Sequence, residues 1–228
     1  MLIKIMLEKN ERIDFFREIF PEEPEQMFDY MMNYNELMMK YNSAIREVKT
    51  KLEILNDELS LGDKGNPIDS IQSRIKKPIS IAQKLKKLGK PITFETIADL
   101  NDIAGVRVIC SFIDDIYKIS DMIAKQDDIA VIEIRDYIKN PKPNGYRSYH
   151  MIVEVPVFFS DSKQHIRVEI QIRTVAMNFW ASLEHRLKYK NNATDTEEIV
   201  NDLKECADVI ANTDLKMLEI KGKIDKFS

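Results

Sequence analysis

Polar and hydrophobic residues alternate strictly along residues 165–173, and apolar residues then recur at helical spacing from residue 175. An alternation with a period of two predicts a strand that is packed on one side. Its apolar face consists of Val168, Ile170 and Ile172, and its polar face consists of Arg167, Glu169, Gln171 and Arg173. Thr174 suits the N-cap of the following helix, whose apolar positions are Val175, Phe179, Trp180, Leu183 and Leu187.

The same periodicity analysis predicts the other elements of the chain. We expect helices over residues 13–20, 27–59, 78–88, 96–101, 114–126 and 195–226. We expect strands over residues 106–112, 129–138 and 151–159, besides an extended segment at Arg74–Lys76. The fold class that follows is α/β (α+β): a mixed sheet of about five strands flanked by helices, with helical N- and C-terminal segments.

Composition excludes several classes of protein. The 228 residues are 44% hydrophobic and 32% charged, which is typical of a globular protein and not of a disordered one. No apolar run approaches the length of a membrane span, so we expect no membrane partner. Cys110 and Cys206 lack CxxC spacing, and the three histidines lack zinc-site spacing. We therefore expect reduced thiols and a cytoplasmic location.

Charge is unevenly distributed although the net charge is only −4. Residues 70–94 contain seven bases and no acid, which indicates an anionic ligand. Pro78 and Gly89 bound a predicted helix within this block, and Ser80, Lys84 and Lys87 share one of its faces. A solvated amphipathic helix would give the same pattern, as a solvated outer strand face would for residues 167–173.

The candidate chemistry rests on side chains, because the six glycines form neither GxxxxGK[ST] nor GxGxxG. Asp102 and Glu169 are candidates for a magnesium ion that shares its coordination with phosphate oxygens. Tyr146 follows a flexible Asn-Gly pair and suits stacking on a base. These residues together indicate magnesium-dependent phosphoryl transfer. The cations available for phosphates are Arg74, Lys76, Lys84, Arg107, Arg135, Lys142, Arg167 and Arg173, with the Ser80 hydroxyl beside them.

Four motifs, in this order, resemble the synthetase domain of the RelA/SpoT family. They are RIKKPxSIxxK at 74–84, DIAGVR at 102–107, YIKNPKPNGYRSYH at 137–150 and VEIQIRTxAMNFWASLEH at 168–185. The chain is similar to the small alarmone synthetases of the RelQ type, which consist of that domain alone. The resemblance implies a nucleotidyltransferase-like fold with a helical segment at 1–66, the synthetase domain at 67–190 and a C-terminal packing helix at 191–228.

The resemblance also implies an activity and a role for each matching residue. Pyrophosphate would pass from ATP to the 3′-hydroxyl of GDP or GTP, giving ppGpp or pppGpp and AMP. Asp102 and Glu169 would bind Mg²⁺, and Glu169 would also act as the base. ATP would be held by Arg74 and Arg107 around the adenine and by Lys76, Ser80 and Lys84 on the phosphates. GDP or GTP would be held by Arg135, Lys142, Asn144, Tyr146, His150 and Gln171.

RelQ-type relatives form homotetramers with a central cleft for the product, so the resemblance implies a homotetramer here. Two cleft positions differ in this sequence, where they read Glu53 and Ser70. We therefore expect a weak response to pppGpp. An alternative is a catalytically weak RNA-binding or regulatory protein on the same fold, because the basic block would also suit single-stranded RNA. A nucleotidyltransferase acting on RNA ends would usually carry a DxD pair, which is absent.

Overall fold

The computed structural model describes residues 24–61, 66–190 and 197–226. Its core is a five-stranded sheet with the order β1-β2-β5-β4-β3. The strands are β1 (Ile68–Ile75), β2 (Ala104–Cys110), β3 (Ala130–Asp136), β4 (Tyr149–Phe158) and β5 (Lys163–Thr174). Only the pair β2–β5 is parallel, and the other three pairs are antiparallel. The predicted mixed sheet is therefore confirmed.

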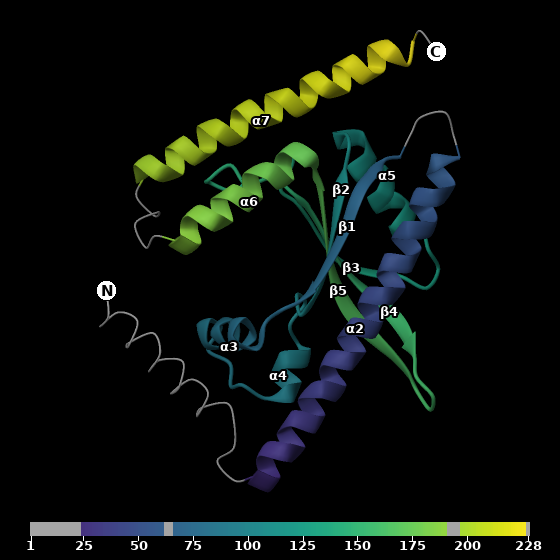
Figure 1. Cartoon of the computed structure of the whole chain (residues 1–228), viewed down its shortest axis with the longest axis vertical. Coiled ribbons are helices and arrows are strands. Elements are labelled where there is room, and N and C mark those ends of the chain that lie inside the picture. Colours follow the sequence, from purple (N-terminus) through teal and green to yellow (C-terminus); the bar gives the residue numbers. More distant parts are fainter. Residues whose placement is uncertain (1–23, 62–65, 191–196, 227–228) are drawn as a thin grey trace.

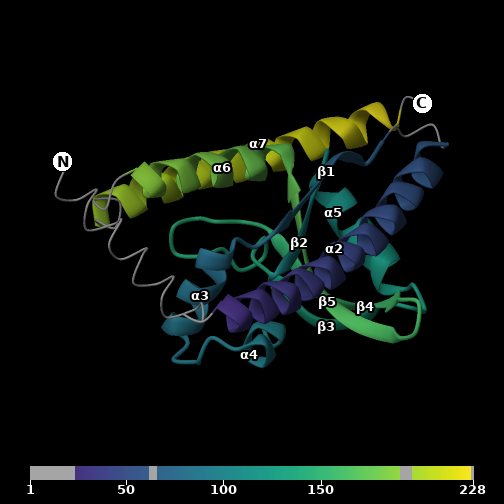
Figure 2. The ribbon, with the colours of Figure 1, turned by 60° about the horizontal axis from the view of Figure 1, so that its bottom comes forward.

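The helices form three groups, one on a face of the sheet and two at its ends (Figures 1 and 2). Helices α2 (Pro24–Ser60) and α5 (Ile113–Ala124) pack on the apolar face of the sheet. Helices α6 (Val175–Lys190) and α7 (Glu197–Ile224) lie side by side at one end of the sheet. Helices α3 (Pro78–Lys87) and α4 (Phe94–Ala98) form a short pair toward the opposite end. No helix within the described ranges is both long and apolar enough to cross a membrane.

One face of the sheet is apolar and packs against helices α2 and α5 in the core. Val168, Ile170 and Ile172 of β5 are fully buried against Val48 and Leu52 of α2, within a cluster that also includes three isoleucines of α5. Burying one such side chain contributes about 1.5–3 kcal/mol, so this face fixes the register of the strands. Because side chains alternate, the residues between them must point to the opposite, polar face. Helix α2 shares this core, and the predicted boundary at 66/67 stays a prediction.

Several predicted boundaries were wrong by a few residues, for local reasons. β1 spans eight residues where only Arg74–Lys76 was expected to be extended, because it pairs along its length with β2. β2 begins at Ala104, two residues before the prediction, and β4 begins at Tyr149 because Tyr149 and His150 find partners on β5. α4 begins at Phe94 because Thr93 forms a capping box with Thr96. The helix predicted over 13–20 lies outside the described residues.

Two predicted helix ends agree with the structure. α3 begins at Pro78 and ends at Lys87, and Gly89 follows with a φ of 66° that side chains rarely adopt. Thr174 caps α6, since its Oγ1 accepts the Met177 amide proton at 3.0 Å. Most of the apolar residues predicted to lie on one face of α6 are not buried in the core. Trp180 is buried, whereas Val175, Phe179, Leu183 and Leu187 are exposed.

The Thr174 hydroxyl also connects α6 to α7, because it donates to Asp214 Oδ2 at 2.7 Å in a buried setting. Burial raises the pKa of Asp214, with the Thr174 bond and the Arg147 charge opposing this rise. We expect Thr174→Val to lower the free energy of unfolding by about 0.5–2 kcal/mol, because the cap is lost and Asp214 loses its partner. Urea unfolding measures this change. The matched control is Thr213→Val at an exposed site on α7, and equal midpoints for both variants would contradict the prediction.

Candidate active site

The polar face of the sheet gathers the predicted catalytic residues in two rows. Cross-strand register aligns the first row as Gln72, Arg107, Gln171, His150 and Arg135. The second row, two residues along each strand, runs Arg74, Gly105, Glu169, Ile152 and Glu133. Residues paired across neighbouring strands share a face, so Arg107, Gln171 and His150 lie on the same face of the sheet as Glu169. Glu169 lies in the central strand and is paired with Gly105 of β2.

Glu169 is held at both carboxylate oxygens. His150 Nδ1 lies 3.3 Å from Oε1, and the Gln171 amide donates to Oε2 at 2.8 Å. Both Glu169 and His150 side chains are largely buried, with exposed fractions of 14% and 9%. The carboxylate therefore has a single orientation, set by its two neighbours on β4 and β5.

A closed hydrogen-bond ring extends from Glu169 through Arg173. Arg173 Nη2 donates to the Tyr146 hydroxyl at 2.6 Å and to Gln171 Oε1 at 2.9 Å. The Tyr146 hydroxyl lies 2.9 Å from His150 Nε2. Because a guanidinium only donates, the tyrosine oxygen accepts from Arg173 and its own proton points to His150 Nε2. A neutral His150 then carries its proton on Nδ1, where it faces Glu169.

The ring keeps Glu169 ionised. Burial raises the pKa of its carboxyl, but the hydrogen bonds that it accepts from His150 and Gln171 outweigh burial. The pKa therefore lies below its ordinary value, although the nearby charge of Asp102 opposes this. The negative form is thus present at neutral pH, ready to accept a proton or to bind a cation.

Asp102 lies just before β2 and forms ion pairs with two lysines of the basic segment 70–94. Lys76 Nζ pairs with Oδ2 at 2.8 Å, and Lys84 Nζ pairs with Oδ1 at 2.8 Å. Burial raises the pKa of Asp102, and these two lysines more than reverse the rise, so the pKa lies below its ordinary value. The structure thus brings three predicted residues together at one point.

The two carboxylates fit a magnesium ion that binds phosphates at the same time. Asp102 Oδ1 is buried and accepts no well-directed hydrogen bond from the described residues, and the charge of Asp102 reaches Glu169. Magnesium usually takes one or two carboxylates and completes its octahedron with water and substrate phosphate.

An arginine cluster lies on the β1–β2 side of Glu169. The strand register places Arg74, Arg107 and Arg173 at neighbouring positions on one face of the sheet. Burial and the positive charges of Arg173 and Arg74 lower the pKa of Arg107. Arg107 Nε is buried without a hydrogen-bond partner among the described residues, whereas Arg74 is exposed. Clustered guanidiniums with unsatisfied donors suit an anion or a planar ring.

The loop between β3 and β4 supplies the aromatic part of the site. Lys142 Nζ lies 5.0 Å from the centre of the Tyr146 ring, and the Arg173 guanidinium lies 5.2 Å from it. Tyr137 and His150 meet the same ring edge-on, at centroid distances of 6.0 Å each. Asn144 accepts the Tyr146 amide proton and donates to Glu184 of α6 at 3.1 Å. Cations near an aromatic face, in a partly buried loop, are a suitable base-stacking platform.

Arg135 and Ser80 are two further residues that the sequence predicted for the site. Arg135 is in register with His150 on edge strand β3, but its guanidinium is paired bidentately with Glu133 at 2.6 and 2.7 Å. Ser80 is a half-buried residue of α3. Sequence reasoning did not assign a site role to Tyr137, Ser148 or Glu184, which contact Tyr146, Arg173 and Asn144. The YRSY motif and the helical spacing of Glu184 are evident in the sequence, but neither feature predicts these side-chain contacts.

The fold and this face together define a class of protein: a mixed-sheet α+β domain that presents carboxylates and cations on one open face, without a glycine loop for phosphates. Residues 73–194 match the family described as the region found in RelA / SpoT proteins. The chain belongs to this RelA/SpoT family. It is 43% identical over 192 residues to the GTP pyrophosphokinase YwaC of Bacillus subtilis, covering 84% of this chain and 91% of the relative.

Further relatives give the same result. YjbM, another GTP pyrophosphokinase of Bacillus subtilis, is 36% identical over 193 residues, which cover 85% of this chain and 90% of YjbM. The structure of small alarmone synthetase 1 from that organism, bound to its product pppGpp, superposes with a TM-score of 0.78 at 36% identity. That match covers 84% of this chain and 97% of the other. Small alarmone synthetase 2 gives a TM-score of 0.75 at 42% identity, covering 83% and 99%.

Proposed function

We propose that this protein transfers the pyrophosphate group of ATP to the 3′-hydroxyl of GDP or GTP, making the alarmones ppGpp or pppGpp and AMP. The observation that carries the proposal is Glu169, oriented at both oxygens and placed between the arginine cluster and the Tyr146 loop. A base between a donor site and an acceptor site is what a reaction between two nucleotides requires. Family membership and the pyrophosphokinase names of its relatives support the same reaction.

ATP would bind on the side of β1, β2 and α3. Arg74 and Arg107 would hold the adenine between planar guanidiniums, and Lys76, Ser80 and Lys84 would contact the phosphates. In the structure Lys76 and Lys84 neutralise Asp102, so phosphates and a metal ion would replace these ion pairs on binding. The solved structure of small alarmone synthetase 1 bound to AMPCPP, with a TM-score of 0.73 at 33% identity over 85% of this chain and 98% of the other, supports an ATP-type ligand on this fold.

GDP or GTP would bind on the side of β3, β4 and the acceptor loop, which we define as residues 140–148. Tyr146 would stack on guanine, and Asn144, His150 and Gln171 would surround the nucleoside. Lys142 and Arg135 would face the phosphates of the acceptor, for which Arg135 would have to exchange Glu133 for phosphate. The 3′-hydroxyl would then point toward Glu169.

The reaction needs one proton transfer and one displacement. The 3′-oxygen attacks the β-phosphorus of ATP, the bond from that phosphorus to the oxygen bridging the α-phosphate breaks, and AMP leaves with that oxygen. The hydroxyl proton passes to Glu169, which His150 and Gln171 keep oriented. Asp102 and Glu169 are the residues that would hold Mg²⁺, whose charge would neutralise the phosphates during attack.

A product assay tests the proposed function. AMP should be released only when ATP, a guanosine nucleotide and Mg²⁺ are all present, and a new guanosine product should appear in equal amount by anion-exchange chromatography. A panel of GMP, GDP and GTP would also identify the preferred acceptor, because stacking does not report the number of phosphates. AMP release that is independent of the guanosine nucleotide would refute the proposal.

We also infer that the protein is a homotetramer. α6 and α7 carry several exposed large apolar side chains, which are Val175, Phe179, Leu183, Leu187, Val209, Leu215, Met217, Ile220 and Ile224. Exposed apolar residues in such number favour burial against another subunit. Light scattering during size exclusion at micromolar concentration should give the mass of four chains, and the mass of one chain would refute this inference.

The response of this assembly to pppGpp should be weak. Glu53, at one of the two cleft positions that differ, lies on α2 with its carboxylate 3.6 Å from Lys49 Nζ, so this neighbouring cation already has a partner of opposite charge. A carboxylate at this position is unfavourable for an anionic effector. We expect less than about a twofold change in the initial rate when pppGpp is titrated, and activation of several-fold would contradict the role assigned to Glu53. The cytoplasmic location and single-stranded RNA as a partner stay predictions.

A further inference from the structure

We propose that helix α7 is the support that holds the acceptor loop in place, with Arg147 and Gly145 as positioning residues for Tyr146. This inference rests on the proposed function, because it concerns how the acceptor site is built. It assigns to the C-terminal helix a role in binding the guanosine nucleotide, whereas sequence reasoning gave this helix a role in packing only.

The first observation is the contact between Gly145 and α7. Gly145 is buried and has a φ of +85°, a conformation that favours glycine. A side-chain carbon at this position would lie 2.5 Å from the Ala207 methyl group and 3.1 Å from the Lys204 Cα atom. The loop backbone therefore lies directly on the helix, and both residues at the contact must be small.

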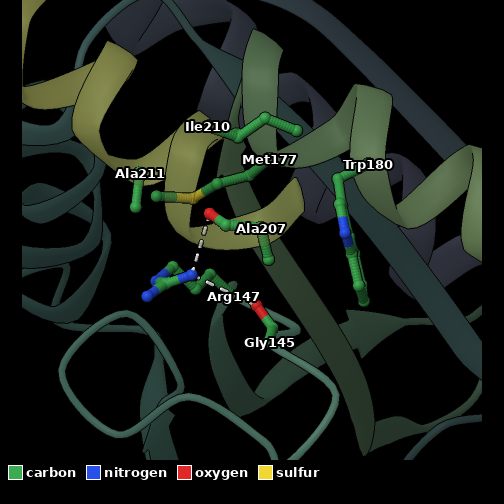
Figure 3. A pocket seen from close by; sticks show the side chains of 7 residues that line it. All are labelled: Gly145, Arg147, Met177, Trp180, Ala207, Ile210 and Ala211. Atoms are coloured by element: carbon green, nitrogen blue, oxygen red, sulfur yellow. Dashed lines mark hydrogen bonds between the residues drawn. The ribbon is translucent and has the colours of Figure 1, made fainter. Parts of the chain in front are cut away.

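The second observation is the guanidinium of Arg147, which ties the loop to the same turn of α7. It donates to the Ala207 carbonyl at 3.1 Å and to the Gly145 carbonyl at 3.4 Å (Figure 3). It also donates to Asp208 Oδ1 at 3.0 Å. The Arg147 side chain is only 17% exposed, so these bonds are partly shielded from water. Charge-assisted bonds in such a setting are stronger than neutral ones.

The third observation is that α6 and α7 complete the wall behind Tyr146. Trp180 packs against the Tyr146 ring at a centroid distance of 6.3 Å, and its indole N–H donates to the Leu203 carbonyl of α7 at 2.9 Å. The cavity between loop and helices measures about 10 Å³, with Met177, Ile210 and Ala211 completing its lining (Figure 3). This volume is at the lower limit for one water molecule, so the site is a close-packed joint and not a ligand pocket.

These contacts make Tyr146 depend on α7. The loop's internal bonds, such as Gly145 N–H to Lys142 O at 2.8 Å, shape its turn but do not fix its place relative to Glu169. On the sheet side the Tyr146 hydroxyl is bonded to Arg173 and His150. The loop backbone is held from the other side, by Arg147 and Gly145 on α7 and by Asn144 on α6. A displaced loop would therefore weaken acceptor binding and leave the ATP side, on β1, β2 and α3, unchanged.

Two variants test this proposal, one on helix α7 and one on the acceptor loop. Ala207→Leu keeps a good helix former in α7 but places a larger side chain where the loop backbone lies. Arg147→Met removes the three donated bonds and keeps much of the side-chain volume. The matched control is Lys221→Met, which breaks another α7 contact, the 2.8 Å ion pair with Asp114, far from the loop. Cys206→Leu controls for a leucine at the neighbouring, exposed position of α7.

We expect the Michaelis constant for GDP or GTP to rise about tenfold in Ala207→Leu and Arg147→Met, because bonds of this kind contribute roughly that factor. The Michaelis constant for ATP should stay within about twofold. In both controls the two Michaelis constants and the rate at saturation should also stay within about twofold. Equal effects on the two Michaelis constants, or none in Arg147→Met, would overturn the proposal. Arg147→Met decides the question if Ala207→Leu does not fold.

A second readout does not depend on catalysis, so it separates this inference from the proposed function. Trp180 is the only tryptophan of the chain and is 5% exposed behind the acceptor loop. Its emission should shift to longer wavelength, and its quenching by acrylamide should rise, in Arg147→Met and not in Lys221→Met. Unchanged Trp180 fluorescence in Arg147→Met would show that the loop stays on α7 without this residue and would overturn the proposal, even if synthesis is observed.

Discussion

Replacing Glu169 by glutamine should reduce the rate of alarmone synthesis by about 10²- to 10⁴-fold, the range typical of a lost general base. The amide is nearly isosteric and can still accept the His150 Nδ1 proton, so the sheet should survive, although the amide nitrogen cannot accept the bond that Gln171 donates to Glu169. It cannot take the 3′-hydroxyl proton, and it binds a divalent cation poorly. The Michaelis constants should therefore change much less than the rate.

The control for this variant is Glu154→Gln on neighbouring strand β4. Glu154 lies on the same face and pairs with Arg167 at 3.6 Å, but it is more exposed and has no contact with the ring. Its removal should change the rate less than about twofold, as expected for an exposed ion pair. If Glu169→Gln kept more than about a tenth of the wild-type rate, Glu169 would not be the base.

Tyr146→Ala should raise the Michaelis constant for the guanosine nucleotide roughly 5- to 150-fold, because stacking of a base on an aromatic ring contributes about 1–3 kcal/mol. The constant for ATP should change far less, since the arginine cluster and α3 form the other side of the site. Initial rates measured at varied concentrations of each substrate separate the two constants.

Tyr146→Phe distinguishes stacking from the hydrogen-bond ring. It keeps the aromatic face and removes the hydroxyl that joins Arg173 to His150. We expect a near-normal Michaelis constant for the acceptor with a lower maximal rate, because Glu169 loses part of its orientation. Equal changes of both Michaelis constants in Tyr146→Ala would instead make Tyr146 a general structural residue.

The sheet was predictable because its signal is local. Strict alternation along residues 165–173 required one buried face, and the structure buries Val168, Ile170 and Ile172 completely. Strand order was not predictable in the same way: β5 lies between β2 and β4, so its parallel partner comes from a strand about sixty residues earlier. The missed extent of β1 has the same cause, because its sequence becomes a strand through pairing with β2.

The members of the site were predictable in kind, whereas their connections were not. The RelA/SpoT motifs named Asp102, Glu169 and Tyr146 individually. The ring through Arg173, and the pairing of both Lys76 and Lys84 with one aspartate, depend on side-chain directions that only the folded sheet provides. The same holds for Gly145, whose Asn-Gly context indicated a flexible turn although the residue is buried against Ala207.

Helices α6 and α7 show where periodicity gives an incomplete picture. The apolar spacing of Val175, Phe179 and Leu183 predicts a helix correctly, but it does not reveal what covers that face. Within the described chain, α6 uses Trp180 and Ala181 to meet α7 and leaves the stripe exposed. An apolar stripe that one subunit leaves exposed is consistent with the proposed assembly.

The origin of the transferred phosphates tests the central claim most directly. The protein would be incubated with GDP and Mg²⁺ and with ATP labelled in separate reactions at the α- or the γ-phosphate, and the products would be separated by chromatography. Pyrophosphate transfer predicts that the γ label appears in the guanosine product, that the α label appears only in AMP, and that no ADP forms. Formation of ADP together with a guanosine product carrying the γ label would show transfer of a single phosphate and would contradict the assignment.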